Sequence, residues 1–183
     1  MSEHEFKIVF TGPMGAGKTT AIGAISDDPP VSTDVVNTDR AAFDKAQTTV
    51  GLDYGHIDIG DGRVVRLYGT PGQLRYRFLW DILGNNAAGV IVLIDASQAD
   101  ALVQLDAFVD AFGGGRRAPV VVGIGRSGQP GALALDTFAQ RLESHGLTLP
   151  VFGVDVRRRD DVLLLVDTLL CLLELDDVAG RTA

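Results

Sequence analysis

Short runs of consecutive apolar residues recur along the chain, separated by segments of mixed polarity. The runs that predict buried strands are residues 6–10, 89–94, 120–124 and 151–154. The segments that predict helices are residues 19–26, 99–112, 133–144 and 160–175. Between the first helix and the middle of the chain, residues 31–49 are polar and irregular, and we expect a long functional loop there.

A hairpin is predicted in the first half of the chain. Residues 54–59 and 63–68 flank Gly60-Asp61-Gly62, a sequence typical of a tight turn. Elsewhere strands alternate with helices, which predicts a mainly parallel sheet with helices on both faces. We therefore expect six strands, with one antiparallel strand at an edge of the sheet, in a single α/β domain over residues 1–176. A flexible tail is expected at 177–183.

Composition excludes several classes of protein. The 183 residues are 46% hydrophobic and 22% charged, which excludes disorder as the main state. A net charge of −8 argues against a general nucleic-acid binder. No run is long enough to span a bilayer, and the termini carry no signal peptide or lipidation motif, so we expect no direct membrane anchor. The single cysteine, Cys171, is expected to be buried in the last helix and fits a cytoplasmic location.

A glycine-rich segment follows the first predicted strand and opens the first predicted helix. Residues 12–19 read Gly-Pro-Met-Gly-Ala-Gly-Lys-Thr, a full match to G-x-x-x-x-G-K-[ST] in the context that confirms this phosphate-binding motif. Lys18 is expected to reach the β- and γ-phosphates, and the Thr19 hydroxyl to ligate Mg²⁺. The residues expected around the phosphates are Gly12, Met14, Gly15, Ala16, Gly17, Lys18, Thr19 and Thr20.

Two later segments extend this pattern. Thr48-Thr-Val-Gly follows the irregular segment, and Leu67-Tyr-Gly-Thr-Pro-Gly-Gln73 ends the hairpin. With these segments in this order, the chain resembles Ras-superfamily small GTPases over residues 5–175, and bacterial Ras-like GTPases with a Gly-Thr-Pro-Gly-Gln switch II in particular. The resemblance implies a three-layer P-loop NTPase fold. It also implies a G domain that binds GTP or GDP with Mg²⁺, hydrolyses GTP slowly and controls a partner.

The resemblance also implies roles for residues of the two switch segments. Thr49 would ligate Mg²⁺ and sense the γ-phosphate, or Thr48 if the register is shifted by one. Gly72 would donate its N–H to the γ-phosphate, and Gln73 would orient the attacking water. The alternatives are an edge-strand threonine and an exposed loop amide.

Arginines near the switches are candidates for stabilising transition-state charge. Arg75 is the first candidate, with Arg77 and Arg40 as others, and each has the alternative of a surface or partner-contacting arginine. In bacterial relatives the regulatory partner is of the roadblock type, so the resemblance implies such a partner here.

Two positions depart from the family pattern. Gly69 stands where switch II normally begins with an aspartate that holds a water on Mg²⁺, so we expect weaker or rearranged metal support. Guanine recognition normally uses Asn-Lys-x-Asp, but residues 125–128 read Gly-Arg-Ser-Gly, and arginine cannot accept a hydrogen bond. Arg126 is expected to stack on the base, and Asp155 to lie near it or to cap the last helix. Asp95 is expected to be a strand-end or capping residue rather than a metal ligand.

Three functions compete for this pattern. The first is a GTPase switch. The second is a degenerate nucleotide-binding scaffold with weak or no guanine specificity, for which Gly69 and the missing base motif argue. The third is a P-loop small-molecule kinase, whose arginine-bearing lid only Arg116-Arg117 would supply. The Gly-Thr-Pro-Gly-Gln segment argues against the kinase.

Overall fold

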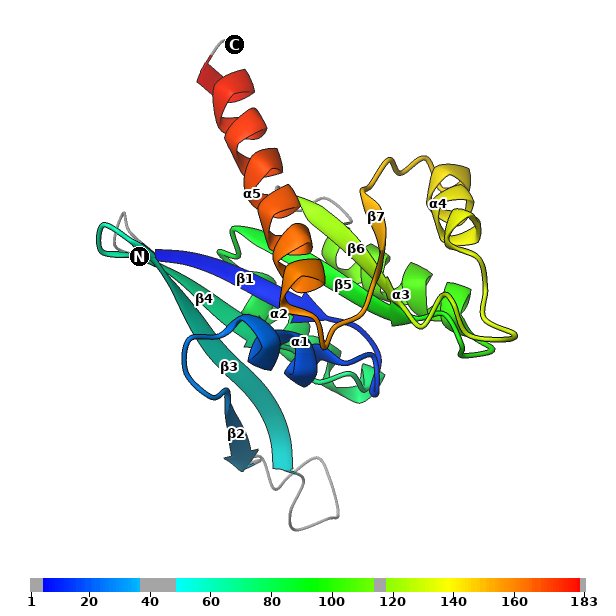
Figure 1. Ribbon diagram of the computed structural model, residues 1–183, viewed down its shortest axis with the longest axis horizontal. Coiled ribbons are helices and arrows are strands. Elements are labelled where there is room, and N and C mark those ends of the chain that lie inside the picture. The colour runs from blue at the N-terminus through cyan, green and yellow to red at the C-terminus, as the bar shows by residue number, and fades with distance from the viewer. Residues whose placement is uncertain (1–4, 37–48, 114–117, 182–183) are drawn as a thin grey trace.

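The computed structural model describes residues 5–36, 49–113 and 118–181, which form one seven-stranded sheet with helices on both faces (Figure 1). The strands are β1 (Glu5–Thr11), β2 (Val31–Val36), β3 (Thr49–Gly60), β4 (Arg63–Gly69), β5 (Gly89–Asp95), β6 (Val120–Gly125) and β7 (Val151–Val154). The helices are α1 (Lys18–Ile25), α2 (Arg77–Gly84), α3 (Ala101–Gly113), α4 (Leu135–Ser144) and α5 (Arg159–Arg181), with a 3₁₀ turn, η1 (Leu74–Tyr76), before α2. The predicted three-layer α/β fold is confirmed.

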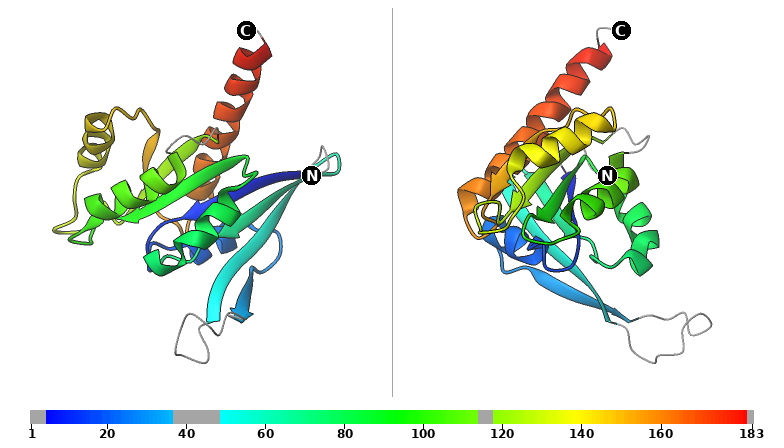
Figure 2. Two further views of the ribbon diagram at one scale, coloured as in Figure 1. Left: turned by 180° about the vertical axis from the view of Figure 1, so that it is seen from behind. Right: turned by 90° about the vertical axis from the view of Figure 1, so that its right-hand side faces the viewer.

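The apolar runs are continuous because the central strands are covered on both faces. In β5, Ile91 and Leu93 pack with α1 and α5 on one face, whereas Val90, Val92 and Ile94 pack with α2, α3 and α4 on the other. Alternate residues of a strand point to opposite faces. A strand that is buried on both faces therefore has apolar residues at successive positions instead of alternating apolar and polar ones. Figure 2 shows the two helical layers on either side of the sheet.

The strand count corrects the sequence prediction from six to seven. The strand order is β2-β3-β4-β1-β5-β6-β7, and β3 is antiparallel to both β2 and β4. The antiparallel strand is therefore second from the edge, and β2 forms the edge. The sequence did not indicate β2 because a strand with one neighbour has no continuous apolar run to mark it.

Two helices also differ from the prediction. The eight-residue α2 was not expected, since it begins without a capping side chain. Helix α5 continues to Arg181, through most of the predicted tail, because the segment before Gly180 contains neither glycine nor proline to end it. Its C-terminal part projects beyond the sheet (Figures 1 and 2), and Cys171 is exposed rather than buried.

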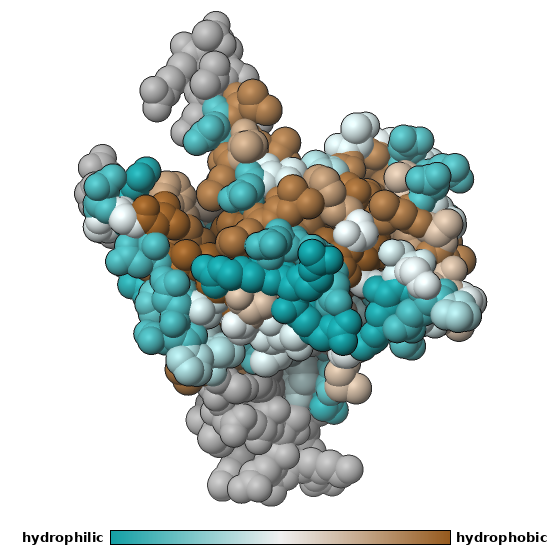
Figure 3. All heavy atoms as spheres, viewed as in Figure 1, coloured by the Kyte–Doolittle hydropathy of each residue, from teal (hydrophilic) through white to brown (hydrophobic). Residues whose placement is uncertain are grey.

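The surface around α5 is mixed in character. Figure 3 shows apolar side chains gathered around α5 where it lies on the sheet, and hydrophilic side chains around the start of this helix. Leu164 and Leu175 are the exposed leucines of α5. Among the described residues, no helix combines the length and the apolar character needed to cross a bilayer.

Candidate functional site

A cleft of about 1030 Å³ opens at the carboxyl ends of the parallel strands, where ligands of open α/β sheets bind. Four segments of the chain form its walls. The loop between β1 and α1 lies at one end, the loops after β6 and β7 (residues 125–129 and 153–157) lie at the other, and Thr70 to Gly72 lie after β4. The cleft thus combines the segments that the sequence predicts to bind nucleotide.

The phosphate loop has the backbone that its glycines allow. Gly12, Gly15 and Gly17 have φ values of 140°, 84° and 92°, a region that favours glycine. A Cβ on Gly12 would lie 2.1 Å from the Leu93 carbonyl oxygen, and one on Gly17 would lie 2.7 Å from Val156 Cγ2. The glycines therefore let the loop pass close to β5 and to the loop after β7.

Lys18 lies within the phosphate loop. Its Nζ donates hydrogen bonds to the carbonyl oxygens of Gly12 and Pro13, each at 2.8 Å. Burial lowers the pKa of Lys18 to about 8. The lysine is thus a desolvated donor held by two backbone acceptors, which an anionic ligand can replace.

A carboxylate that the sequence analysis missed lies beside Thr19. The Thr19 hydroxyl donates to Asp53 Oδ2 at 2.6 Å. Asp53 belongs to β3 and pairs with Gly69 of β4. A Cβ on Gly69 would lie 3.0 Å from Asp53 Cβ and 3.1 Å from Asp53 Oδ2, so Asp53 fills the space that a side chain at position 69 would enter.

The hairpin turn contained the signal for Asp53. Asp53 lies eight positions before Asp61, and Gly69 lies eight positions after it. A tight turn centred on Asp61 therefore places the two residues opposite one another. The glycine at position 69 and the aspartate at position 53 are thus related through strand pairing and not through sequence proximity.

The oxygen donors around Thr19 suit a hard divalent cation. A hydroxyl and a carboxylate are the ligand types that Mg²⁺ takes alongside phosphate oxygens. Within the described ranges, no group of three or more His, Cys, Asp or Glu side chains is placed to hold a metal. Thr19 and Asp53 are the described residues whose oxygens could contact a metal at this point.

The predicted switch I residues are only partly described. Thr49 begins β3, where its backbone pairs with Val36 of β2. Thr48 and Arg40 lie outside the described residues. The role of Thr49 as a ligand of Mg²⁺ stays a prediction.

The segment after β4 lies against the phosphate loop. A Cβ on Gly72 would lie 2.4 Å from the Met14 backbone nitrogen, so only glycine allows this approach. Gln73 Nε2 lies 3.9 Å from Sδ of Met14, whose side chain is 76% exposed. The structure therefore brings Gly72 and Gln73 to the phosphate loop, as the sequence predicts.

Two hydrogen bonds fix the start of this segment. The hydroxyls of Thr11 and Thr70 are 2.8 Å apart, and Trp80 Nε1 donates to the Pro71 carbonyl oxygen at 2.8 Å. Trp80 is itself buried in the core beneath α2, where its ring lies 4.4 Å from that of Phe108. The backbone leading into Gly72 is thus held at two successive residues, Thr70 and Pro71.

Two of the three arginine candidates, Arg75 and Arg77, lie outside the cleft. Arg75 is exposed, and its guanidinium carbon lies 4.9 Å from the centre of the Tyr76 ring. Arg77 begins α2 and is also exposed. Neither residue is among those that line the cleft.

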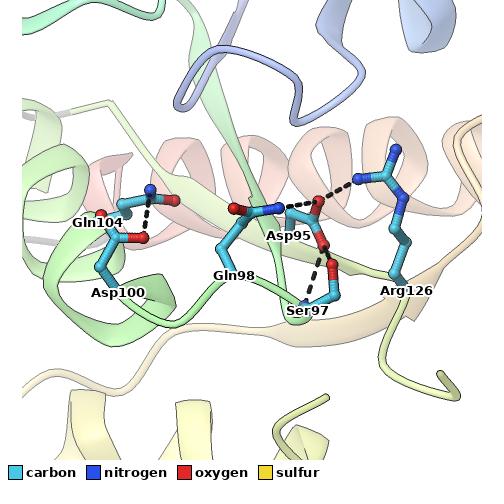
Figure 4. Close-up of polar contacts among 6 residues, drawn as sticks. All are labelled: Asp95, Ser97, Gln98, Asp100, Gln104 and Arg126. Atoms are coloured by element: carbon cyan, nitrogen blue, oxygen red, sulfur yellow. Dashed lines mark hydrogen bonds and ion pairs between the residues drawn. The ribbon is translucent and has the colours of Figure 1, made fainter. Parts of the chain in front are cut away.

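Arg126 and Asp95 form an ion pair at the far end of the cleft. Figure 4 shows the Arg126 side chain reaching from the loop after β6 to Asp95, at the end of β5. Asp95 Oδ1 also accepts the Ser97 N–H and hydroxyl, at 3.0 and 2.6 Å, and Oδ2 accepts from Gln98 at 3.3 Å. Burial raises the pKa of Asp95, but these hydrogen bonds and the charge of Arg126 outweigh it and lower the pKa below its ordinary value. Asp95 therefore lies at the end of β5 and stabilises the turn that follows this strand.

Asp155 lines the same end of the cleft from the loop after β7. Its Oδ1 accepts from Arg157 Nε at 2.8 Å and from the Arg157 backbone N–H at 3.1 Å, and its Oδ2 accepts from the guanidinium at 2.6 Å. Hydrogen bonds from Arg157 lower the pKa of Asp155 to about 2. The Asp155 backbone N–H donates to Asp161 Oδ2 at 2.9 Å, so Asp161 rather than Asp155 ties this loop to α5.

Comparisons with known proteins found distant relatives that match about half of the chain. No family model matches the chain. ADP-ribosylation factor-related protein 1 of Homo sapiens is 30% identical over 100 residues, which are 55% of this chain and 47% of that protein. Intraflagellar transport protein 22 of Chlamydomonas reinhardtii is 25% identical over 114 residues, 61% of this chain and 55% of that protein. An uncharacterized protein of Methanocaldococcus jannaschii is 28% identical over 98 residues, 54% of this chain and 56% of that protein.

The chain spans about half the length of the curated relatives that it matches. Over that part the chain is similar to an ADP-ribosylation factor-related protein and to an intraflagellar transport protein.

Proposed function

We propose that this protein is a guanine-nucleotide switch that binds GTP or GDP with Mg²⁺, hydrolyses GTP slowly and controls a protein partner in the cytoplasm. One observation carries the proposal. The phosphate loop and the Gly72–Gln73 segment lie in contact at one end of a single cleft, with Lys18 and Thr19 beside them. A γ-phosphate bound in the loop would therefore meet the segment that responds to it.

Phosphate binding would replace contacts that the protein makes with itself. Lys18 Nζ would leave the carbonyl oxygens of Gly12 and Pro13 for the β- and γ-phosphates, and the ligand would restore its full charge. The backbone N–H groups of residues 14–20 and the N-terminus of α1 would cradle the phosphate oxygens.

Thr19 and Asp53 would hold the metal end of the nucleotide. Bound Mg²⁺ neutralises charge on the β- and γ-phosphates. The Thr19 hydroxyl would ligate it directly, and Asp53 would supply from β3 the carboxylate that position 69 lacks. In the triphosphate-bound state, Thr49 would supply a second hydroxyl ligand to Mg²⁺.

The residues at the cleft support the proposal of slow hydrolysis. Gln73 would orient a water at the γ-phosphate, and the Gly72 N–H would bind the phosphate itself. Arg75 contacts Tyr76 outside the cleft, so the protein alone offers no arginine at the reacting phosphate from the described residues. A regulatory partner, of the roadblock type by the resemblance, would act by repositioning Arg75 or Gln73.

A second candidate is a nucleotide-binding scaffold with weak guanine specificity. Gly125 and Gly128 favour it, because they stand where the family carries its base-binding amide and carboxylate. The kinase alternative depends on Arg116-Arg117, which lies outside the described residues.

Titration calorimetry with GDP and a GTP analogue in Mg²⁺ tests the proposal, together with mass spectrometry of the nucleotide retained by the purified protein. Lys18→Ala should weaken triphosphate binding by about 100-fold, since it removes charge-assisted hydrogen bonds worth about 3 kcal/mol. Lys7→Ala removes a positive charge outside the cleft and should leave the affinity unchanged. Equal affinity of Lys18→Ala and the parent protein would refute phosphate binding in this loop.

A further inference from the structure

The loop after β6 lacks the hydrogen-bond acceptors that a guanine base would need at its end of the cleft. Guanine presents a ring N–H beside an exocyclic amino group, and both need an acceptor. Gly128 offers no side chain, and Arg126 is only a donor. If the proposed guanine-nucleotide switch is correct, another group in the cleft must accept these hydrogen bonds.

Four carboxylates of the described residues line the cleft, and three of them already have other tasks. Asp53 accepts from Thr19 at the phosphate end. Asp95 is 4% exposed and accepts from Ser97, Gln98 and Arg126. Asp161 accepts the Asp155 backbone N–H and lies 3.7 Å from Arg158.

Asp155 is the fourth, and its position suits a base acceptor. The loop that carries it contacts both ends of the nucleotide path. Val156 packs against Gly17 of the phosphate loop, and a Cβ on Gly153 would lie 3.3 Å from Ser127 Oγ in the loop after β6. Asp155 thus lies on a wall of the cleft that links the phosphate loop to the loop after β6.

The charge and the accessibility of Asp155 also suit this task. Its side chain is 36% exposed, so a ligand can reach it. Among the residues that the structure describes, Oδ2 accepts from the Arg157 guanidinium alone, which leaves lone-pair capacity on that oxygen. Arg157 keeps the carboxylate ionised and holds it in place from the solvent side, where its own side chain is 79% exposed.

We infer that Asp155 is the carboxylate that recognises the base, and that it selects guanine over adenine. The carboxylate would accept from the guanine ring N–H and amino group. Adenine presents a lone pair beside its amino group, which would repel the same oxygens. Arg157 is a positioning residue in this arrangement.

Asp155→Asn tests the assignment with a change of base preference as its readout. An amide at this position donates a hydrogen bond, and the C2 carbonyl of xanthine accepts one where guanine has an amino group. We expect the affinity for GDP to fall at least tenfold and the affinity for xanthosine diphosphate to rise at least tenfold. Asp160→Asn, at an exposed carboxylate on α5 that does not line the cleft, should change neither affinity.

The outcomes separate this inference from the proposed function. A parent protein that binds GDP and ADP equally, in a manner lost in Lys18→Ala, would overturn the base assignment and leave phosphate binding in place. Equal losses of GDP and xanthosine diphosphate affinity in Asp155→Asn would also overturn it, because they would make Asp155 a structural residue. Failure of the parent protein to bind any nucleotide would refute the proposed function and the inference together.

Discussion

Exchanging the residues at positions 53 and 69 tests whether Asp53 supplies the carboxylate of the proposed metal site from β3, in place of a residue at position 69 on β4. In the parent protein, Asp53 stands opposite Gly69 and accepts from Thr19 at 2.6 Å. The exchange Asp53→Gly with Gly69→Asp returns the carboxylate to β4 and keeps one carboxylate in the same space. Each single change breaks this arrangement in a different way.

The structure sets the size of each single effect. Asp53→Gly removes a charged acceptor beside Thr19, a loss of about 1.5–3 kcal/mol, and should reduce the Mg²⁺ enhancement of GDP affinity ten- to a hundredfold. Gly69→Asp places a second carboxylate against the first, with its Cβ 3.1 Å from Asp53 Oδ2. Two such charges repel by up to about 4 kcal/mol, and because Asp53 is only half-buried we expect the free energy of unfolding to fall by about 2 kcal/mol.

The exchange should recover both properties. Calorimetry of GDP binding in millimolar Mg²⁺ and in excess chelator measures the metal enhancement, and thermal unfolding measures stability. Asp53→Asn is the matched control, since it keeps the shape of the side chain and removes its charge. The reasoning is refuted if Asp53→Asn retains the full Mg²⁺ enhancement, or if the exchange binds GDP no better in Mg²⁺ than Asp53→Gly alone.

Two further predictions concern turnover and pH. Gln73→Leu should slow single-turnover phosphate release at least tenfold without changing GTP affinity, whereas Arg75→Ala, outside the cleft, should leave intrinsic release unchanged; the opposite result would assign the catalytic role to Arg75. The pKa of Lys18 is about 8 in the free protein, and phosphate binds its charged form, so triphosphate affinity should fall about fourfold between pH 7 and 8.5. A flat profile in calorimetry over this range would show that Lys18 stays fully charged without ligand.

The sequence predicts those parts of the fold that local rules decide. The runs at 89–94 and 120–124 are apolar at every position because the sheet is covered on both sides, so β5 and β6 could be found by inspection. The glycine-rich loop between β1 and α1 was equally visible, since Gly12 and Gly17 have positive φ values and close contacts that a side chain would not allow. Strand β2 and helix α2 were missed because one pairs at an edge and the other begins without a capping side chain.

The sequence identified candidate residues that belong to recognisable motifs, and it missed a candidate that reaches them through strand pairing. Gly72 and Gln73 lie at the phosphate loop, as predicted. Asp53 was not among the candidates, because only the register of the β3–β4 hairpin brings it to Gly69 and Thr19. Arg126 was expected to stack on a base. Its guanidinium instead pairs with Asp95, which lies thirty-one positions earlier in the sequence.

Trp80 gives this protein an optical reporter of its own state. It is the only tryptophan of the chain, it is 1% exposed, and its indole N–H is bonded to the carbonyl of Pro71, one residue before Gly72. Any ligand that draws Gly72 toward or away from the phosphate loop must pull on that hydrogen bond. Indole emission shifts with the polarity and hydrogen bonding of its surroundings, so nucleotide exchange should be visible in unlabelled protein, in real time, from a single side chain on the far side of the sheet from α1.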